Sequence, residues 1–199
     1  KKSSLCIQKH AIKNSKGQEV ASAGHWIDNN WINIGIAHFY KREFFSGIEA
    51  FEYVVRTYTK SQDKYVAMLW LIKSYNEIGS VSNSEQIITL LKNEKRSLSP
   101  AIRDEFAVVM ADYYTRRGQN TEAIARLMET TRKTNLFTGV PRKKRARYSF
   151  IIGQMLEQAK DNNRAILFYR KTIKLKPSYE MIFYSKIKVA RLQDLKRSN

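Results

Sequence analysis

Residues 146–177, ARYSFIIGQMLEQAKDNNRAILFYRKTIKLKP, decide the fold of this chain. Apolar side chains recur at helical spacing on both sides of a polar, turn-forming centre. Gly153 and Ala165 are small residues at which two helices can approach closely, and the large Tyr169 follows Ala165 by one helical turn. Pro177 marks the end of the second helix, because proline cannot continue it. The stretch therefore predicts a tightly packed helical hairpin.

Three earlier stretches repeat this order of residues, which predicts four hairpins in all. The repeating pattern resembles the tetratricopeptide repeat (TPR), a 34-residue helix–turn–helix unit. Because one hairpin cannot bury its own apolar face, the copies are expected to stack into an α-solenoid. The residues equivalent to Gly153, Ala165 and Tyr169 are Gly35, Gly47 and Phe51 in the first copy, Ile72, Ser84 and Ile88 in the second, and Ala111, Ala123 and Leu127 in the third.

The predicted class is all-α, with about four TPR-type hairpins and one flanking helix at each end. Glycines in the second and third hairpin turns, Gly79 and Gly118, suit the left-handed conformation that ends a helix. The N-terminal region, 1–25, is predicted to contain a short helix around Ser4–Ile12 and a linker. The predicted helix pairs are 26–41 with 44–58, 63–78 with 82–93, 100–117 with 120–134, and 143–160 with 162–175, giving a solenoid over 26–177 with repeats at about 26–59, 63–94, 100–134 and 143–177.

A further helix is predicted from Tyr179 to Leu195, within the last region, 178–199. It is interpreted as a terminal cap or as the first helix of another repeat. Its apolar stripe is formed by Met181, Phe183, Tyr184, Ile187 and Ala190.

Charge is distributed unevenly along the 199 residues. Residues 1–129 contain 18 Lys and Arg against 14 Asp and Glu, whereas residues 130–199 contain 18 against 4. An electrostatic partner is therefore expected to dock on the C-terminal third. No apolar run is long enough to predict a membrane span, and the single cysteine, Cys6, excludes an intrachain disulfide.

Nothing in the sequence predicts catalysis, a metal site or a cofactor. His38 occupies a core position of the first hairpin and His25 precedes its first helix, so both are interpreted as core or capping residues. No Gly-rich phosphate loop is present. The chain is therefore predicted not to be an enzyme.

The TPR resemblance implies that the first helix of each hairpin lines a concave, partner-binding surface. An alternative is that Phe39 and Tyr40 pack beneath the N-terminal helix. Ile32 and Ile36 stand where TPR clamps for a chaperone's terminal carboxylate need Lys and Asn, so that clamp is not expected. The residues chosen as partner-binding candidates are Ile36, Phe39, Tyr40, Lys73, Glu77, Asp112, Arg116 and Gln154.

A basic stretch precedes the fourth hairpin, and no acidic residue occurs between Glu129 and Glu157. It is interpreted either as a solvated loop entering a helix or as a site for an acidic protein, an anionic lipid surface or nucleic acid. Specific nucleic-acid recognition is not expected, because helical hairpins supply the charge without base-reading groups. The stretch contains Arg142, Lys143, Lys144, Arg145 and Arg147.

A more specific resemblance covers nearly the whole chain from Ile7. It is carried by IQKHAIK (7–13), WID (26–28), FFSGIEAFEY (44–53), DKYVAMLWLIKSYN (63–76), ADYY (111–114), ARYSFI (146–151) and LKPSYEM (175–181). This series resembles the SprE/PorW lipoproteins of Bacteroidota, which belong to the type IX secretion and gliding machinery.

The resemblance implies a scaffold that joins components of the translocon at the periplasmic face of the outer membrane. It also implies a lipid anchor on an N-terminal cysteine, which is expected outside this segment and is not assigned to Cys6. Two alternatives remain open: a peptidoglycan- or anionic-lipid-binding module that uses the basic C-terminal third, and a cytoplasmic TPR adaptor.

Overall fold

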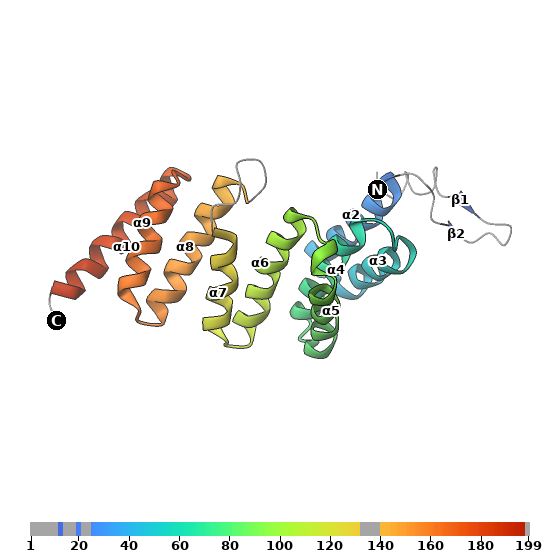
Figure 1. Ribbon diagram of the computed structural model, residues 1–199, viewed down its shortest axis with the longest axis horizontal. Helices are drawn as coiled ribbons and strands as arrows, with labels where there is room; N and C mark the ends of the chain where they lie inside the picture. Colours follow the sequence, from blue (N-terminus) through green and yellow to red (C-terminus); the bar gives the residue numbers. More distant parts are fainter. Residues whose placement is uncertain (1–11, 14–18, 21–24, 132–139, 198–199) are drawn as a thin grey trace. The chain divides into compact units, whose positions relative to one another are not determined.

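The computed structural model describes residues 12–13, 19–20, 25–131 and 140–197. Its described residues form nine helices, one short 3-10 helix and a small β-ladder (Figure 1). The all-α class predicted from the sequence is confirmed. The helices are α2 (His25–Tyr40), α3 (Phe44–Thr57), α4 (Asp63–Glu77), α5 (Val81–Asn93), α6 (Pro100–Arg116), α7 (Asn120–Thr131), α8 (Arg142–Gln158), α9 (Asn162–Lys174) and α10 (Tyr179–Arg197).

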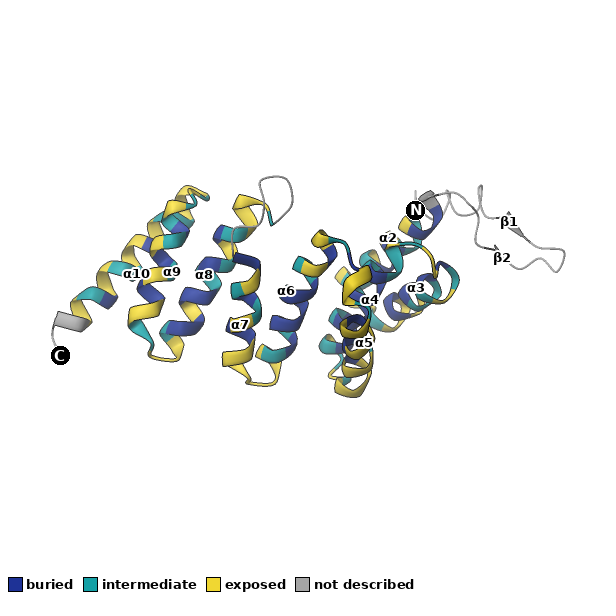
Figure 2. Ribbon diagram, in the orientation of Figure 1, coloured by how far each residue is buried: buried dark blue, intermediate teal, exposed yellow. Residues whose placement is uncertain are grey.

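The described residues belong to two compact units, Lys1–Ile102 and Arg103–Asn199. Along each helix, buried residues alternate with exposed ones, as expected of amphipathic helices (Figure 2). None of the helices among the described residues is both long enough and apolar enough to cross a membrane.

The four hairpin turns share one backbone conformation. Gly79 and Gly118 have φ of 73° and 71°, which confirms the left-handed turns predicted for them. Arg42 and Lys160 hold the same place in the first and fourth hairpins with φ of 65° and 59°. Most side chains disfavour this region, so these two turns were not recognisable from residue type.

The core of the first unit is built around Phe51, which is fully buried on α3. A Cβ atom added to Gly35 of α2 would lie 2.5 Å from the Phe51 ring. A Cβ added to Gly47 would lie 3.2 Å from the backbone oxygen of Gly35. These two glycines therefore allow α2 and α3 to approach, as the sequence pattern predicted.

The connection from α5 to α6 is held by polar contacts and contains a short 3-10 helix, η1 (Lys95–Ser97). Glu94 accepts hydrogen bonds from Lys64 Nζ at 3.1 Å and from Tyr65 Oη at 2.6 Å. These bonds lower the pKa of the Glu94 carboxyl group. The loop expected between the second and third hairpins is thus anchored to α4.

In the second unit, Tyr169 of α9 plays the part that Phe51 plays in the first. It is fully buried, and a Cβ added to Gly153 of α8 would lie 2.8 Å from its ring. Its hydroxyl donates a 2.7 Å hydrogen bond to Glu157 of α8. Burial and this bond raise the pKa of Tyr169 far above its usual value, so the hydroxyl remains a donor.

Glu157 joins α8, α9 and α10. Besides the Tyr169 hydroxyl, it accepts bonds from Lys188 Nζ at 3.1 Å and from Arg191, both on α10. Burial alone would raise the pKa of this carboxyl group, but the bonds from Tyr169 and Lys188 and the charges of Lys188 and Arg191 outweigh it, so the pKa is lowered. Glu157 therefore stabilises the packing of α10 as an ion.

We expect Glu157 to make the free energy of unfolding depend on pH. Its folded pKa lies below the unfolded value near 4.5, so its contribution is present above pH 4.5 and is lost as the pH falls through the folded value. Urea unfolding of Glu157→Gln should show a loss of about 1.5–3 kcal/mol at neutral pH and a shallower decline in acid than the wild type. Parallel acid declines in the two proteins would contradict this role.

The α10 helix packs on α9 through a face that lies outside most of its predicted apolar stripe. Ser185 and Leu192 are buried, and Val189 packs against the core of the second unit. Phe183, Tyr184 and Ile187, which belong to the predicted apolar stripe, are exposed. The two bonds to Glu157 place Lys188 and Arg191 toward α8, and this turns the aromatic side of α10 outward.

Near the N-terminus, β1 (Ile12–Lys13) pairs antiparallel with β2 (Glu19–Val20). The helix predicted around Ser4–Ile12 lies outside the described residues except for Ile12, where the structure has a strand. Ile12 is directly opposite Val20, and both are β-branched residues that favour strands. The expected linker therefore contains a short β-ladder.

Candidate functional site

The first unit presents an aromatic surface, defined here as Phe39, Tyr40, Trp70 and Lys73. The centroid of the Trp70 ring lies 5.2 Å from that of Phe39 and 6.1 Å from that of Tyr40, both edge-on. Lys73 Nζ lies 4.2 Å from the Trp70 centroid, within cation–π range. Tyr40 is 75% exposed, whereas the other three residues are partly buried, so Tyr40 is the most accessible part of the surface.

The aromatic surface rests on the core of the first unit. Trp70 stacks on the buried Phe51, with centroids 6.0 Å apart and planes 15° apart. Phe44 supports Phe39 from α3 at 5.5 Å. A rigid backing of this kind lowers the entropy that the rings lose when a partner binds.

Three of the candidates from the first unit, Phe39, Tyr40 and Lys73, thus lie together around Trp70. Ile36 is partly buried and packs against the core, which limits its access to a partner. Ile32 is buried in the same core. Glu77 is exposed at the end of α4.

Trp70 was absent from the sequence-based candidates, although it is the ring that joins the others. A signal for it existed, because Trp70 precedes Lys73 by three residues and the two share a helix face. The repeat positions that are expected to line the concave surface of a TPR protein do not include the position of Trp70, so Trp70 was not among the candidates.

In the second unit the candidates do not form a comparable cluster. Arg116 Nε lies 3.0 Å from Asp112 Oδ2, so these two side chains pair with each other along α6. Gln154 is exposed on α8. The pairing leaves Asp112 and Arg116 less able to select a partner by charge.

The basic stretch divides into exposed and structural members. Lys143, Lys144 and Arg147 are exposed on α8. Arg142 is also exposed, but its Nε donates a 2.7 Å hydrogen bond to the Leu175 carbonyl at the end of α9. The stretch is therefore largely the first turn of a helix, and Arg142 also stabilises the end of the neighbouring helix.

Arg145 is the inward member of the stretch. It is partly buried, with its Nε out of contact with solvent. Burial and the charge of Arg145 lower the pKa of Lys171, whose Nζ donates to the Thr131 carbonyl at 3.0 Å. Substituting Arg145 would thus disturb the packing around α7 and α9 as well as the charge.

The histidine and metal predictions concern few residues. His38 Nδ1 lies 2.6 Å from Glu43 Oε2 in the first hairpin turn, so the partly buried ring, which was predicted to be a core or capping residue, is held at the turn. The His25 side chain lies outside the described residues. Within residues 25–131 and 140–197, no three His, Cys, Asp or Glu side chains gather as a metal site would require.

Comparison with known proteins gives the fold an independent basis. No family model and no curated protein matches the chain. Among solved structures it is similar to the crystal structure of the MamA protein, with a TM-score of 0.57 and 17% identity over 85% of this chain and 82% of that one. It is also similar to a tetratricopeptide repeat protein from Parabacteroides merdae, with a TM-score of 0.55 and 16% identity over 83% of this chain and 57% of that one. The predicted TPR-type fold is confirmed.

Proposed function

We propose that the chain is a protein–protein interaction scaffold that holds a partner segment on the aromatic surface of its first unit. The observation that carries this proposal is the exposed Tyr40 beside Trp70 and Lys73. Tyrosine and tryptophan dominate the energetics of protein interfaces, because they bury a large area with few rotatable bonds. No catalytic role is assigned to any residue.

The chemistry of the surface defines the partner segment that it suits. The exposed Tyr40 ring and the partly buried Trp70 ring beside it offer apolar surface to an apolar or aromatic side chain. Lys73 adds a positive charge directly beside them, which favours a neighbouring carboxylate. A segment with an aromatic or large aliphatic residue next to an acidic one therefore fits best.

We further propose that this scaffold serves in type IX secretion, at the periplasmic face of the outer membrane. The support is the resemblance of stretches such as residues 63–76 and 175–181 to the SprE/PorW family. The partners are then translocon and outer-membrane-associated components of that machinery. Attachment to the membrane is assigned to a lipid anchor outside this segment.

The test measures binding of individual type IX components to the intact chain and to Tyr40→Ala and Trp70→Ala variants. A component that uses the aromatic surface should bind about tenfold or more weakly to each variant, as expected for hot-spot residues. Leu90→Ala is the matched control, because Leu90 is an exposed apolar residue on α5 of the same unit. Equal binding to all four proteins would remove the aromatic surface from the proposal.

A second candidate function is binding to an anionic surface through α8. It is favoured by exposed Lys143, Lys144 and Arg147 on a helix whose first turn contains no acidic residue. Cations at a helix N-terminus are unfavourable, so a bound anion would relieve them. The second candidate therefore differs from the first in both its site and its chemistry.

Sedimentation with phosphatidylglycerol vesicles distinguishes this second function. Binding should fall steeply as salt is added and should be lost in a variant that combines Lys143→Glu, Lys144→Glu and Arg147→Glu. Arg142 and Arg145 are left unchanged, because their contacts within the fold would confuse a charge effect with a packing effect. An absence of sedimentation at low salt would contradict the second function and leave the first untouched.

A further inference from the structure

Two buried polar atoms on one face of α8 have no hydrogen-bond partner among the described residues. They are Arg145 Nε and Ser149 Oγ, and Ser149 is fully buried. The two residues are four positions apart, so they lie one helical turn from each other on the same face of α8. Side chains in a helix lean toward its N-terminus, which directs the Ser149 hydroxyl toward the turn that contains Arg145. Both donors therefore remain available to one further group.

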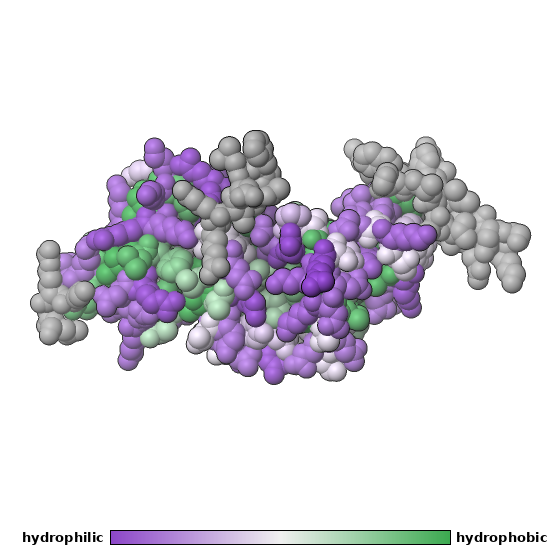
Figure 3. Space-filling model, in the orientation of Figure 1, coloured by the Kyte–Doolittle hydropathy of each residue, from purple (hydrophilic) through white to green (hydrophobic). Residues whose placement is uncertain are grey.

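Lys171 of α9 brings a second positive charge close to Arg145. Its Nζ donates one hydrogen bond, to the Thr131 carbonyl at the end of α7, and an ammonium group has three donors. Burial and, after it, the charge of Arg145 lower the pKa of Lys171, so the two cations repel each other. Hydrophilic side chains gather at the end of this unit where α9 ends and α10 begins (Figure 3). The pair of cations is thus unfavourable unless a negative charge joins it.

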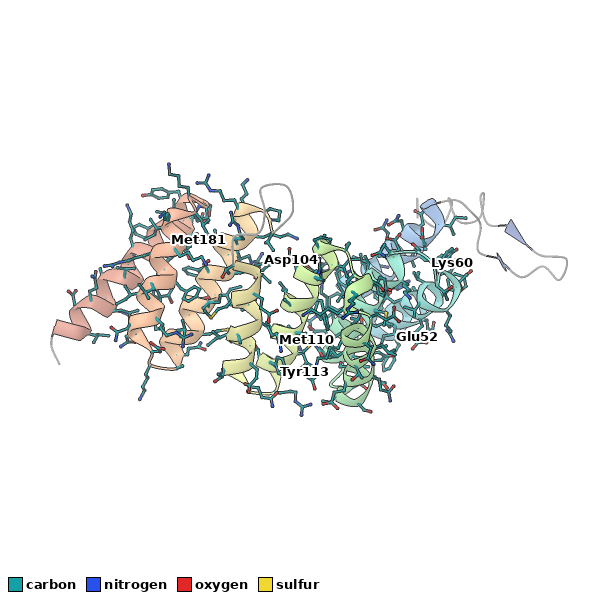
Figure 4. All side chains as sticks on the ribbon, in the orientation of Figure 1. Glu52, Lys60, Asp104, Met110, Tyr113 and Met181 are labelled. Carbon is teal, nitrogen blue, oxygen red and sulfur yellow. The ribbon has the colours of Figure 1, made fainter. Side chains whose placement is uncertain are left out.

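The carboxylates of the second unit are engaged elsewhere. Residues 130–156 contain no Asp or Glu, so the connection from α7 to α8 cannot supply one. Burial and the charges of Glu105 and Asp104 on α6 raise the pKa of Tyr148, so these carboxylates act on that hydroxyl; Asp104 is labelled in Figure 4. The other carboxylates with ion pairs on these helices are Asp112 with Arg116, Glu129 with Arg126, Asp161 with Arg164, and Glu157 with Lys188 and Arg191.

We propose that Arg145, Ser149 and Lys171 form a site for a small inorganic oxyanion of the phosphate and sulfate class. A tetrahedral oxyanion can accept from a guanidinium edge, an ammonium group and a hydroxyl at once, and its charge offsets both cations. The beginning of α8 adds to the attraction, because its first turn has no side-chain cap and a helix N-terminus favours anions.

The enclosure of the two donors decides the size of the ligand. Arg145 Nε and Ser149 Oγ are out of contact with solvent, which excludes a phosphate group carried by a lipid or a protein. Arg145 and Lys171 are only partly buried as whole side chains, and this leaves a route for a small ion. The inference does not rest on the proposed function, and its residues differ from the exposed cations of α8 that define the second candidate.

The test titrates sodium phosphate into the intact chain by isothermal titration calorimetry, with the ionic strength held constant by sodium gluconate. The wild type should bind one phosphate saturably. Arg145→Gln and Lys171→Gln should each bind at least tenfold more weakly, because each loses a charge-assisted hydrogen bond. Arg147→Gln and Lys174→Gln are the matched controls, since they change the same residue types at exposed positions of the same helices, and both should bind as the wild type does.

Two further measurements separate the site from a general effect of charge. Ser149→Ala keeps both cations and removes only the hydroxyl, so phosphate should bind about fivefold more weakly. Phenyl phosphate should bind the wild type at least tenfold more weakly than inorganic phosphate, because its ring does not fit beside enclosed donors. Circular dichroism checks that each variant is folded, and Ser149→Ala with Lys171→Gln decides the outcome if Arg145→Gln is not.

Three results would overturn the inference. The first is no saturable binding of phosphate to the wild type at constant ionic strength. The second is equal affinity in the Arg145→Gln and Arg147→Gln proteins, which would place any bound phosphate on the exposed surface. The third is equal affinity for phosphate and phenyl phosphate, since the ligand would then not be enclosed.

Discussion

Replacing Tyr169 with alanine is expected to lower the free energy of unfolding by about 3–5 kcal/mol. The ring is fully buried, faces Gly153 and packs edge-on against Phe150 with centroids 5.6 Å apart. Its loss leaves a cavity that the surrounding helices cannot close, and Glu157 loses one of its hydrogen bonds. Since a domain is stable by only about 5–15 kcal/mol, this one change should move the unfolding midpoint strongly.

Urea unfolding followed by circular dichroism measures this effect, and two variants divide it into its parts. Tyr169→Phe removes only the hydroxyl and should cost about 1 kcal/mol, because Lys188 and Arg191 still satisfy Glu157. Leu167→Ala on the same helix should change little, since its side chain is exposed. A Tyr169→Ala protein as stable as the Leu167→Ala control would refute the role of the ring in the core.

Replacing Phe51 with alanine is expected to cost a similar amount, about 3–5 kcal/mol, in the first unit. Phe51 is fully buried between Gly35 and the stacked ring of Trp70. Its removal also takes away the support of the aromatic surface. We therefore expect weaker capture of any partner that Trp70 binds, even under conditions in which the protein remains folded.

Phe45→Ala is the matched control for Phe51→Ala, because Phe45 is a phenylalanine of the same helix that is exposed. A double-mutant cycle with Gly35→Ala then tests the contact itself. Gly35→Ala should destabilise the wild type by about 1–3 kcal/mol through overpacking and should be tolerated once Phe51 is alanine. Additive effects of the two substitutions would show that the ring and the glycine do not meet.

Much of the fold was predictable because the hairpins repeat a local rule. A small residue opposite a large one, as at Gly35 and Phe51, is visible in one sequence and fixes which helices can approach. The predicted helix bounds agree with the described helices to within two residues, except that residues 132–134, the predicted end of the sixth helix of the solenoid, lie outside the described residues. The turns at Arg42 and Lys160 gave no signal, because neither residue type indicates a left-handed backbone.

Which face of α10 packs on its neighbours could not be predicted from the sequence, for a physical reason. Hydrophobic periodicity predicts an apolar stripe around Phe183 and Ile187, and such a stripe is the side that an amphipathic helix usually buries. The structure instead buries Ser185 and pairs Lys188 with Glu157, a residue far away in the sequence. Hydrophobic periodicity locates the apolar side of a helix. Contacts with neighbouring helices, such as the one between Lys188 and Glu157, decide which side is buried.

The candidate site was predictable only in part. Phe39, Tyr40 and Lys73 were chosen because of their place in the repeat, and the structure brings them around Trp70. The shared helix face of Trp70 and Lys73 is visible in the sequence, but the contacts of Trp70 with Phe39 and Tyr40 join α4 to α2, and no single-helix pattern provides them. In the same way, the contact of Arg142 with the end of α9 spans 33 residues and lies beyond local reasoning.

The fit between Gly153 and Tyr169 also restricts how this protein can change over generations. A side chain gained at Gly153 would collide with the ring, and loss of the ring at Tyr169 would open a void, so each single change is expected to be harmful. In the second hairpin, Ile72 stands at the position of Gly153 and Ile88 at that of Tyr169, and both are buried. A hairpin with a glycine opposite an aromatic ring and a hairpin with an isoleucine at the glycine position are therefore not interchangeable. A recombinant protein that combines the first helix of one with the second helix of the other should contain either a steric clash or a cavity.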